Sequence, residues 1–588
     1  MRLAVVSVLI VVACGGTTAP SREPAKAPPP VVTSNVLRED YAGSRACSDC
    51  HSAIYQTWES SPMRNMTRDA ATATIRAPFD GASLRVGGDT AVMETVDGKR
   101  MVRVTTADGT LERFTVTKVV GGRYREDFVG TDERGFERVL PATYVFATKS
   151  WRYKGYSVMV KERPAMGTTG RWSQECLPCH NTLPLATMYY DDLDPVVPSY
   201  QGKLSDRVMP PAKQWHAKTL DPDGLVQALE AEIAYLGGDA PKVANAHESL
   251  VAAAVAAEAH LDGPHLVELG VGCEACHNGA KVHAAEPATK PTFAVATGLF
   301  GVTPPVGETG TNAQWINHTC AKCHTVLFSR YPWTWEGGNR RKNPGGSSIS
   351  SGEGRDYQLG ACQSKMACTQ CHDPHTMDSR EKLEAMATPA GNTTCTGCHP
   401  QYAAADALKA HAHHDPAGAG ASCIGCHMPK KNMGLDYALI RYHRIGNPDD
   451  PKRVEADRPV ECALCHADKS VDQLVTTMEG WWGKHYDRAA LHQLYGDDLS
   501  VNALRATLFR GKAHEQAVAI AVFGQAKQQD AVPAIVEQLT NEYPLVRYYA
   551  QRALQTITGD PVAIDVGAPA ADVRVKAAAW LAAWTAKH

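Results

Sequence analysis

The sequence predicts a mainly α-helical protein with much irregular coil, a small antiparallel β insert and a C-terminal domain of α-helical repeats. Three observations predict this class. Cysteine and histidine recur together in one short motif between residues 47 and 466. Residues 82–165 alternate Val and Thr with polar residues. After about residue 500 the motif stops, and amphipathic helical patterns take its place.

The composition excludes two broad classes of protein. Of the 588 residues, 44% are hydrophobic and 21% are charged, which is typical of a globular chain rather than a disordered one. The 60 Lys and Arg nearly balance the 63 Asp and Glu, so the formal net charge is −3. Nucleic-acid binding driven by phosphate neutralisation needs a basic chain, and we do not expect it here.

The N-terminus predicts export and a membrane anchor. The apolar run over residues 3–13 is too short to cross a bilayer but fits the core of a signal peptide. The letters VVAC, ending at Cys14, are similar to the lipobox of bacterial lipoproteins, in which the cysteine is acylated. We expect a signal peptide over residues 1–14, lipidation of Cys14 and a Pro-rich tether over residues 15–38. The protein is then a periplasmic or cell-surface lipoprotein, at the outer rather than the inner membrane because Gly15 is not Asp. An ordinary secretory signal with a chance cysteine is the alternative.

Residues 82–165 are expected to form the β-rich insert. The stretches SLRV, AVMETV, MVRVTT, ERFTVTKVV and SVMVKE have the alternation of half-buried strands. Turn signals such as Asp97-Gly98 and Asp108-Gly109 separate them, which predicts an antiparallel meander. Residues 220–262 have the Ala- and Leu-rich spacing of helices instead.

The C-terminal region carries a short internal repeat. Leu545-Val546-Arg547 is echoed by Asp572-Val573-Arg574, each followed by Ala and Leu at helical spacing. This pattern is typical of HEAT-like helical repeats, expected over residues 500–588. Such repeats often dock a partner protein, and a cap that only shields the rest is the alternative. His514 and His588, in this region, are expected to be solvated.

Sixteen of the 18 cysteines form eight C-x-x-C pairs, and each pair is followed at once by histidine. Two thiols three positions apart can form thioethers with both vinyl groups of one haem, and the adjoining imidazole can bind its iron. Neither a disulfide framework nor zinc sites would need a histidine directly after every pair. We therefore expect eight covalently bound haem c groups, with irregular coil packed around them. Their binding residues are Cys47, Cys50, His51, Cys176, Cys179, His180, Cys273, Cys276, His277, Cys320, Cys323, His324, Cys368, Cys371, His372, Cys395, Cys398, His399, Cys423, Cys426, His427, Cys462, Cys465 and His466.

Each six-coordinate haem iron needs a second axial ligand besides its motif histidine. Fifteen histidines lie outside the motifs, so the supply exceeds the demand. Those that follow a motif closely do not reach round their own haem but can reach a neighbouring one. A solvated surface histidine is the alternative for each candidate. The candidates are His283, His375, His411, His414 and His443. Cys362 belongs to no motif, and is either an unmodified buried thiol or an iron ligand or redox-active thiol.

Six stretches carry a family resemblance: YAGSRACSDCHSAIYQTWESSPM, ECLPCHNTLP, VGCEACHNGAKVH, SKMACTQCHDPH, TTCTGCHP and SCIGCHMPKK, the last with a later RYHRI. Through them, residues 41–466 resemble multihaem cytochromes c related to pentahaem nitrite reductases and octahaem hydroxylamine-type oxidoreductases. The resemblance implies an octahaem domain, which we place over residues 39–495, and it implies that His283, His375 and His443 bind neighbouring haems. The third motif departs from the family by reading CHNGA instead of CHGPG.

The first motif departs from the family in a way that suggests a different ligand. Relatives often place a histidine soon after the tryptophan of this segment, but here Trp58 is followed by two serines, Pro62 and Met63. Met63, or else Met66, is therefore a candidate second ligand of the first iron. A thioether ligand in place of imidazole raises the reduction potential. A methionine packed beside the haem edge is the alternative.

Electron transfer is the expected function, because closely spaced six-coordinate haems exchange electrons with little rearrangement. The related nitrite reductases mark their catalytic haem with C-x-x-C-K, which this chain lacks. Hydroxylamine-type enzymes keep C-x-x-C-H throughout, so a reductase remains the alternative. It would act on a small nitrogen or sulfur oxyanion (nitrite, hydroxylamine or tetrathionate) at one open iron. The expected partners are redox proteins, docked through the C-terminal repeats, and a docking scaffold in which the haems are secondary is a third reading.

Overall fold

The computed structural model describes residues 29–157, 159–168, 170–172, 176–194, 209–241, 245–259, 265–325, 352–376 and 378–587. The expected signal peptide, Cys14 and most of the expected tether lie outside these residues. The remaining tether residues belong to the fold. The amide of Val32 donates to the carbonyl of Lys290 at 3.0 Å, and the side chain of Val36 is fully buried. The tether therefore ends before Val32 rather than at residue 38.

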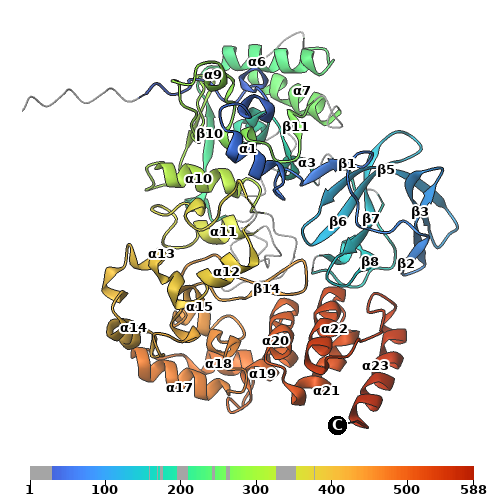
Figure 1. The fold of residues 1–588 in the computed structure, drawn as a ribbon, viewed down its shortest axis with the longest axis vertical. Coiled ribbons are helices and arrows are strands. Elements are labelled where there is room, and N and C mark those ends of the chain that lie inside the picture. Colours follow the sequence, from blue (N-terminus) through green and yellow to red (C-terminus); the bar gives the residue numbers. More distant parts are fainter. Residues whose placement is uncertain are drawn as a thin grey trace, which may run out of the picture.

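An antiparallel sheet of eight strands lies beside the rest of the molecule (Figure 1). Its hydrogen-bonded order is β2-β3-β4-β5-β6-β7-β8, and β1 pairs with β5. Strands β2 and β8, at the two ends of this order, contact each other, so the sheet nearly closes. The strands are β1 (Thr67–Asp69), β2 (Ala82–Val86), β3 (Asp89–Val96), β4 (Lys99–Thr105), β5 (Leu111–Gly121), β6 (Arg125–Thr131), β7 (Glu137–Val145) and β8 (Ser150–Tyr153).

The turn between β3 and β4 shows why the chain reverses there. Asp97 and Gly98 have φ angles of 50° and 75°, the positive values that a two-residue type I′ hairpin turn requires at both positions. The turn closes the pair Val96–Lys99. Along the strands every second residue points inward, and Met93, Phe114 and Phe128 form a buried core inside the sheet.

The last stretch expected to be a strand, residues 157–162, is not one in the described residues. Residues 154–157 form a short 3-10 helix, and the chain from Met159 onward is coil. The amide of Glu162 donates to the carbonyl of Glu542 at 2.9 Å, and its carboxylate pairs with Arg547 at 2.5 Å. This segment follows the C-terminal helices instead of extending the sheet.

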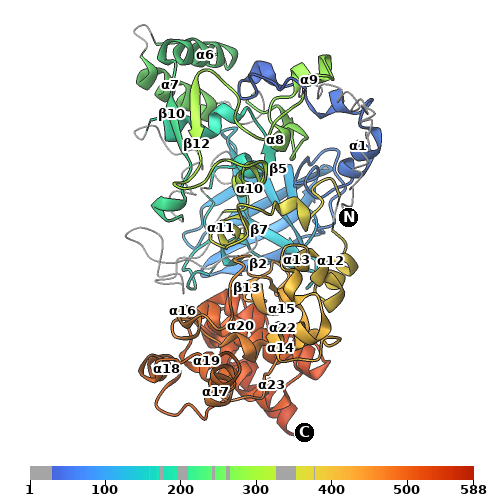
Figure 2. The same cartoon turned by 90° about the vertical axis from the view of Figure 1, so that its left-hand side faces the viewer.

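Helices α6 (Pro222–Tyr235) and α7 (Ala246–Ala259) lie at one end of the molecule (Figure 2). Helix α6 begins at Pro222 because Asp221 caps it by accepting from the amide of Gly224. The two helices share one buried core with Phe300, Val36 and Tyr189. The small strand pairs are β9 (Asn181–Thr182) with β11 (Glu268–Leu269), β10 (His216–Thr219) with β12 (Phe300–Thr303), and β13 (Asn432–Met433) with β14 (Leu439–Ile440).

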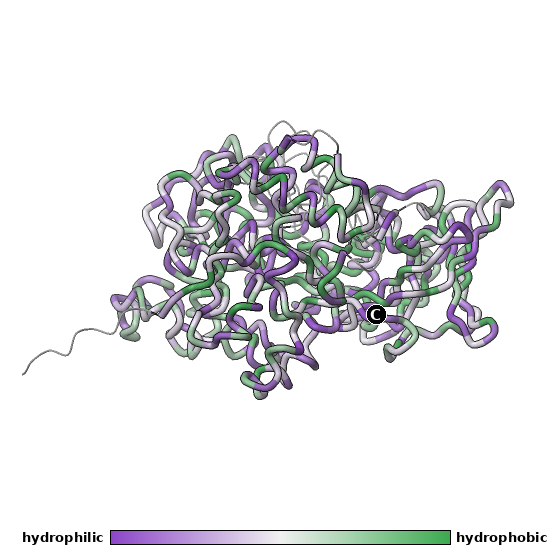
Figure 3. Tube along the Cα trace, turned by 90° about the horizontal axis from the view of Figure 1, so that it is seen from above, coloured by the Kyte–Doolittle hydropathy of each residue, from purple (hydrophilic) through white to green (hydrophobic). Residues whose placement is uncertain are grey.

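The part that carries most of the motifs consists of short helices joined by coil. No helix among the described residues is long and apolar enough to cross a membrane. Hydrophobic and hydrophilic residues alternate at short range along the whole described chain (Figure 3). The short helices are α1 (Ser52–Glu59), α3 (Leu177–His180), α4 (Tyr190–Leu193), α8 (Glu274–His277), α9 (Lys281–Ala285), α10 (Asn312–Ala321), α11 (Glu353–Gln358), α12 (Arg380–Met386), α13 (Thr393–Thr396), α14 (Ala405–Ala412), α15 (Cys423–His427) and α16 (Pro451–Val454).

The C-terminal helices share one hydrophobic core with the residues around the eighth motif. Leu554 and Ile520 belong to the same buried cluster as Val460 and Ala463. A Cβ atom on Gly524 would lie 3.0 Å from the Cα atom of Ala553, so α20 and α22 approach closely there. The boundary expected near residue 500 therefore does not separate two cores. The helices are α17 (Val471–Trp482), α18 (Arg488–Tyr495), α19 (Ala503–Arg510), α20 (Ala513–Gln525), α21 (Val532–Glu537), α22 (Pro544–Thr558) and α23 (Ala570–Thr585).

Candidate haem-binding sites

All eight C-x-x-C-H motifs lie in described residues, and each forms one helical turn. In the first motif, for example, the amide of His51 donates to the carbonyl of Cys47 at 3.0 Å, and in the last that of His466 donates to Cys462 at 2.9 Å. Residues three and four positions apart face the same side of a helix. Each turn therefore presents two thiols and one imidazole to the same space, as one haem with two thioether bonds and a proximal ligand requires.

Five motif histidines face a second imidazole ring across a gap of constant width. Two metal–nitrogen bonds of about 2.0–2.1 Å, plus roughly 1.1 Å from each nitrogen to its ring centre, place such rings about 6 Å apart. The gap therefore fits one iron atom, and the donor set fits low-spin haem. The pairs, with their centroid distances, are His51–His283 (6.2 Å), His277–His375 (6.1 Å), His372–His443 (6.2 Å), His411–His427 (6.0 Å) and His414–His466 (6.0 Å).

The other ring nitrogen of several of these histidines bonds to the backbone. Nδ1 of His283 lies 2.9 Å from the carbonyl oxygen of Thr289, and Nδ1 of His427 lies 2.9 Å from that of Gly446. His443 and His414 make the same kind of bond, to Arg441 at 3.0 Å and to Ala412 at 2.6 Å. A carbonyl oxygen only accepts, so Nδ1 carries the proton and Nε2 is left as the metal ligand.

The structure brings the histidine candidates to motif rings and places Met63 elsewhere. The ring that faces His51 is that of His283, so these two would hold the first iron between them. Met63 lines the large cavity beside the second motif instead. This arrangement favours His283 over Met63 as the second ligand of the first iron. The sequence missed His283 as its partner because the two rings come from segments more than two hundred residues apart.

His180, His324 and His399 take part in none of the five facing pairs. The first two line a cavity of about 1430 Å³, together with the cysteines of their own motifs and of the fifth motif. This volume exceeds the several hundred Å³ that one large ligand needs. The cavity therefore fits more than one haem. Burial, together with the charge of Lys154, lowers the pKa of His180 to about 4, which keeps its imidazole neutral as metal binding requires.

The sheet supplies a charged wall of this cavity. Nη2 of Arg125 and Nζ of Lys154 lie 3.1 and 3.3 Å from the same carboxylate oxygen of Asp127. Burial alone would raise the pKa of Asp127, but the two cations outweigh it and hold that pKa below its ordinary value. Nη1 of Arg125 is buried without a hydrogen-bond partner, and it lines the same cavity. An anionic group would satisfy this donor.

Thiols of different motifs lie near enough to interact, and these interactions connect all eight motifs in one branched row. The thiols hydrogen-bond in the pairs Cys47–Cys273, Cys179–Cys323, Cys320–Cys368 and Cys395–Cys423. Three further pairs interact electrostatically: Cys276–Cys320, Cys371–Cys395 and Cys426–Cys465. The order is therefore 1-3-4-5-6-7-8, with the second motif as a side branch on the fourth.

Cys362 lies near the sixth motif, because Cys395 and Cys398 both act on its thiol electrostatically. It is half-buried, and burial is the main cause that raises the pKa of its thiol. A raised pKa disfavours the thiolate, the reactive form. This environment favours the unmodified-thiol reading of Cys362 over a redox-active one.

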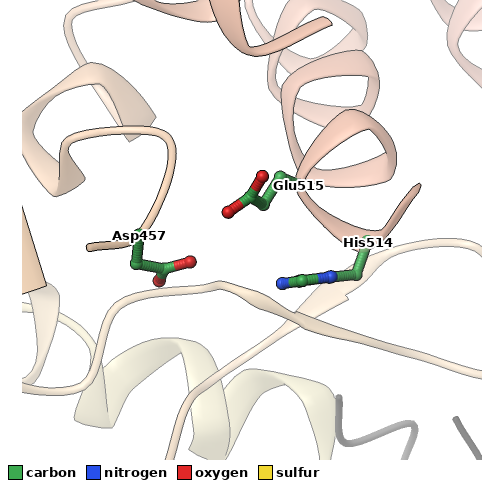
Figure 4. A group of neighbouring side chains, drawn as sticks. All are labelled: Asp457, His514 and Glu515. Carbon is green, nitrogen blue, oxygen red and sulfur yellow. The ribbon is translucent and has the colours of Figure 1, made fainter. Parts of the chain in front are cut away.

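A cluster of Asp457, His514 and Glu515 lies where α20 meets the segment before the eighth motif (Figure 4). Their ligand atoms lie within 4.8 Å of one another. Burial lowers the pKa of His514 to about 3, so this histidine is partly buried and neutral rather than solvated as expected. Lys431 lies 2.5 Å from Asp457, and Nε of Arg458 lies 3.0 Å from Glu515. These cations already compensate both carboxylates, which makes the cluster an ion-pair network and not a metal site.

Comparisons with known proteins add one family match. Residues 361–404, which hold the fifth and sixth motifs, match the family described as the doubled CXXCH motif. The comparison with curated proteins found no match. Among solved structures, the outer cell wall cytochrome OcwA is 14% identical over 88% of this chain and 100% of that chain, with a TM-score of 0.35. A likeness at that score carries no argument here. The family match and the motifs support a multihaem c-type cytochrome with covalently bound haem c.

Proposed function

We propose that this protein carries electrons along eight covalently bound haems, most of them six-coordinate and low-spin. The observation that supports this most is the continuous series of hydrogen-bonding and electrostatic interactions between motif thiols, from the first motif to the eighth. Thioether sulfurs would lie at the haem edge, so neighbouring sulfurs imply closely spaced haems. Bis-imidazole ligation at five irons leaves those metals without an open position, which suits transfer better than catalysis.

The proposal places the protein in the cell envelope. Residues 1–14 would direct export and Cys14 would carry the lipid anchor, with the outer membrane favoured over the inner. Redox proteins on either side would donate and accept electrons. The shared core of the C-terminal helices supports a cap over the eighth haem more than a separate surface for docking partners.

The second motif is a side branch of the row of motifs, so its loss can be compared with the loss of a motif within the row. A photosensitiser would be attached to Arg45→Cys beside the first motif, and an acceptor to Asp468→Cys beside the eighth. Replacing both cysteines of the seventh motif by serine removes the link to the eighth haem, so electron arrival at the acceptor should fall by orders of magnitude. The same change in the second motif removes only the side branch and should leave the rate nearly unchanged. Equal rates in the two variants would refute a through-haem path.

A second candidate function has one observation in its favour. His180 faces no imidazole partner in the five pairs, and the Arg125–Asp127–Lys154 wall lines the same cavity. A cationic wall beside an open iron would bind a small oxyanion. In that case nitrite or tetrathionate should perturb the optical spectrum of one haem in eight, and Arg125→Gln should abolish the effect. If none of nitrite, hydroxylamine and tetrathionate changes the spectrum, the reductase function is refuted and electron transfer is the one candidate that remains.

A further inference from the structure

Among the paired histidines, His372 has the closest carboxylate at its Nδ1 atom, and His375 has the next, with Nδ1 3.3 Å from Oδ1 of Asp373. Nδ1 of His372 lies 2.7 Å from the carboxylate oxygen Oδ2 of Asp378. The comparable nitrogens of His283, His427 and His443 bond to backbone carbonyls at 2.9–3.0 Å. A carbonyl is a neutral acceptor, whereas a carboxylate carries a full charge and makes a stronger bond.

The start of α12 holds this carboxylate in place. The other oxygen of Asp378, Oδ1, accepts from Nζ of Lys382 at 2.6 Å. Ser379 caps the helix by accepting from the amide of Lys382, which fixes the spacing of the two charged residues. The ammonium group of Lys382 pairs with this carboxylate and keeps it ionised. The group is therefore an ionised, nine-tenths buried carboxylate that contacts the ring of His372.

A carboxylate on Nδ1 changes what the imidazole gives to a metal on Nε2. It draws the Nδ1 proton toward itself, so the ring becomes a more basic ligand. A more basic axial ligand stabilises ferric over ferrous iron, and the reduction potential of that iron falls. Lys382 opposes this effect, because its charge neutralises part of the carboxylate.

We propose that Asp378 is a positioning residue that lowers the reduction potential of the fifth haem, held by His372 and His443, below that of the haems whose ligands bond only to backbone carbonyls. This inference rests on the proposed haem ligation. The fifth motif lies in the middle of the row, where Cys368 hydrogen-bonds to the fourth motif and Cys371 interacts electrostatically with the sixth. Electrons then pass an uphill step at its centre, and the Asp378–Lys382 pair sets the height of that step.

Two substitutions with opposite expected signs test the inference. In Asp378→Asn the charge on Nδ1 is lost, and one of the eight components in a redox titration should shift upward by about 59 mV, a tenfold change in its one-electron equilibrium. In Lys382→Gln the carboxylate is no longer compensated, and the same component should shift downward. Glu381→Gln is the matched control, because it removes an exposed negative charge from the same helix without touching His372.

The titration would be followed optically and by EPR, in which the low-spin signal of one haem should also change in Asp378→Asn. No shift in either variant, or shifts of the same sign in both, would overturn the inference, since a purely structural loss does not change sign. Mass spectrometry of each variant counts the attached haems. If the wild-type protein carries no haem, the proposed function is refuted. If all variants carry eight haems and their reduction potentials equal those of the wild type, only the role of Asp378 is refuted.

Discussion

The region of the fourth to seventh motifs and the C-terminal helices are built on different principles. Among the described residues from 304 to 432, the buried hydrophobic side chains are only Ala321, Tyr357, Ala367 and Ala421. The C-terminal helices bury a long succession of Leu, Ile and Val side chains in one cluster. Buried apolar area is the main stabilising term in a protein fold. The motif region therefore depends on its haems for a core, whereas the C-terminal helices depend on their own side chains.

The largest expected effect follows from withholding haem. When the chain is produced without cytochrome c maturation, amide hydrogens of α10 and α15 should lose nearly all protection from exchange, because little apolar surface remains to hold them. Amides of α20 and α22 should stay protected. Hydrogen exchange followed by mass spectrometry measures both. Equal protection of the two regions in the apoprotein would show that the motif region does not depend on haem for its core.

Shortening a leucine side chain in each region tests whether the C-terminal helices depend on their own side chains more than the motif region does. Leu554 is fully buried in α22, and Leu554→Ala should lower the local free energy of opening there by about 2–5 kcal/mol. Leu359, only partly buried in the motif region, gives the matched variant Leu359→Ala, with a smaller loss. Both values come from native-state hydrogen exchange. The haem absorption spectrum should not change in Leu554→Ala, and a change would mean that the cap and the haems are coupled.

Loss of a single facing ring should affect one iron only. His411 faces His427, whereas His413, two residues away, stacks on Trp481 instead. His411→Ala should convert the low-spin signal of one haem to high-spin, since the seventh iron would lose a ligand. His413→Ala should leave the EPR spectrum unchanged. If both variants give the same EPR spectrum, the facing of His411 and His427 does not identify the iron ligands.

The smallest effect is expected at an exposed ion pair between the two parts of the chain. Nζ of Lys161 lies 2.7 Å from a carboxylate oxygen of Glu542, and both side chains are more than half exposed. Glu542→Gln should lower the melting temperature only slightly, consistent with roughly 0–1 kcal/mol, and the difference should vanish in 1 M salt. A persistent difference at high salt would point to packing rather than charge.

Local features could be predicted from the sequence, and long-range pairings could not. The C-x-x-C-H spacing by itself places two thiols and an imidazole on one helical turn. His283, His375, His411, His414 and His443 could be named as candidates because each lies near a motif. Which motif each one faces depends on how distant segments pack. For the same reason the sequence indicates Met63 for the first iron, whereas the structure places the ring of His283 opposite His51.

The same limit applies to the C-terminal region and to the sheet. Helical spacing revealed the helices but not that they share a core with Val460 and Ala463. His514 was expected in solvent, although the ion-pair network around Asp457 surrounds it. The hairpin at Asp97-Gly98 could be read directly, because its turn type depends on two adjacent residues. The stretch 157–162 has a strand pattern, but its partner is the C-terminal region.

The central claim is that every C-x-x-C-H motif carries a haem, and the intact mass of the mature, denatured protein tests it most directly. Thioether bonds survive denaturation, so the account predicts a chain heavier by eight haems, with all sixteen motif cysteines blocked to alkylation and Cys362 alone among the cysteines of residues 29–588 reactive. A mature protein without haem adducts, or with free thiols in several motifs, would contradict it.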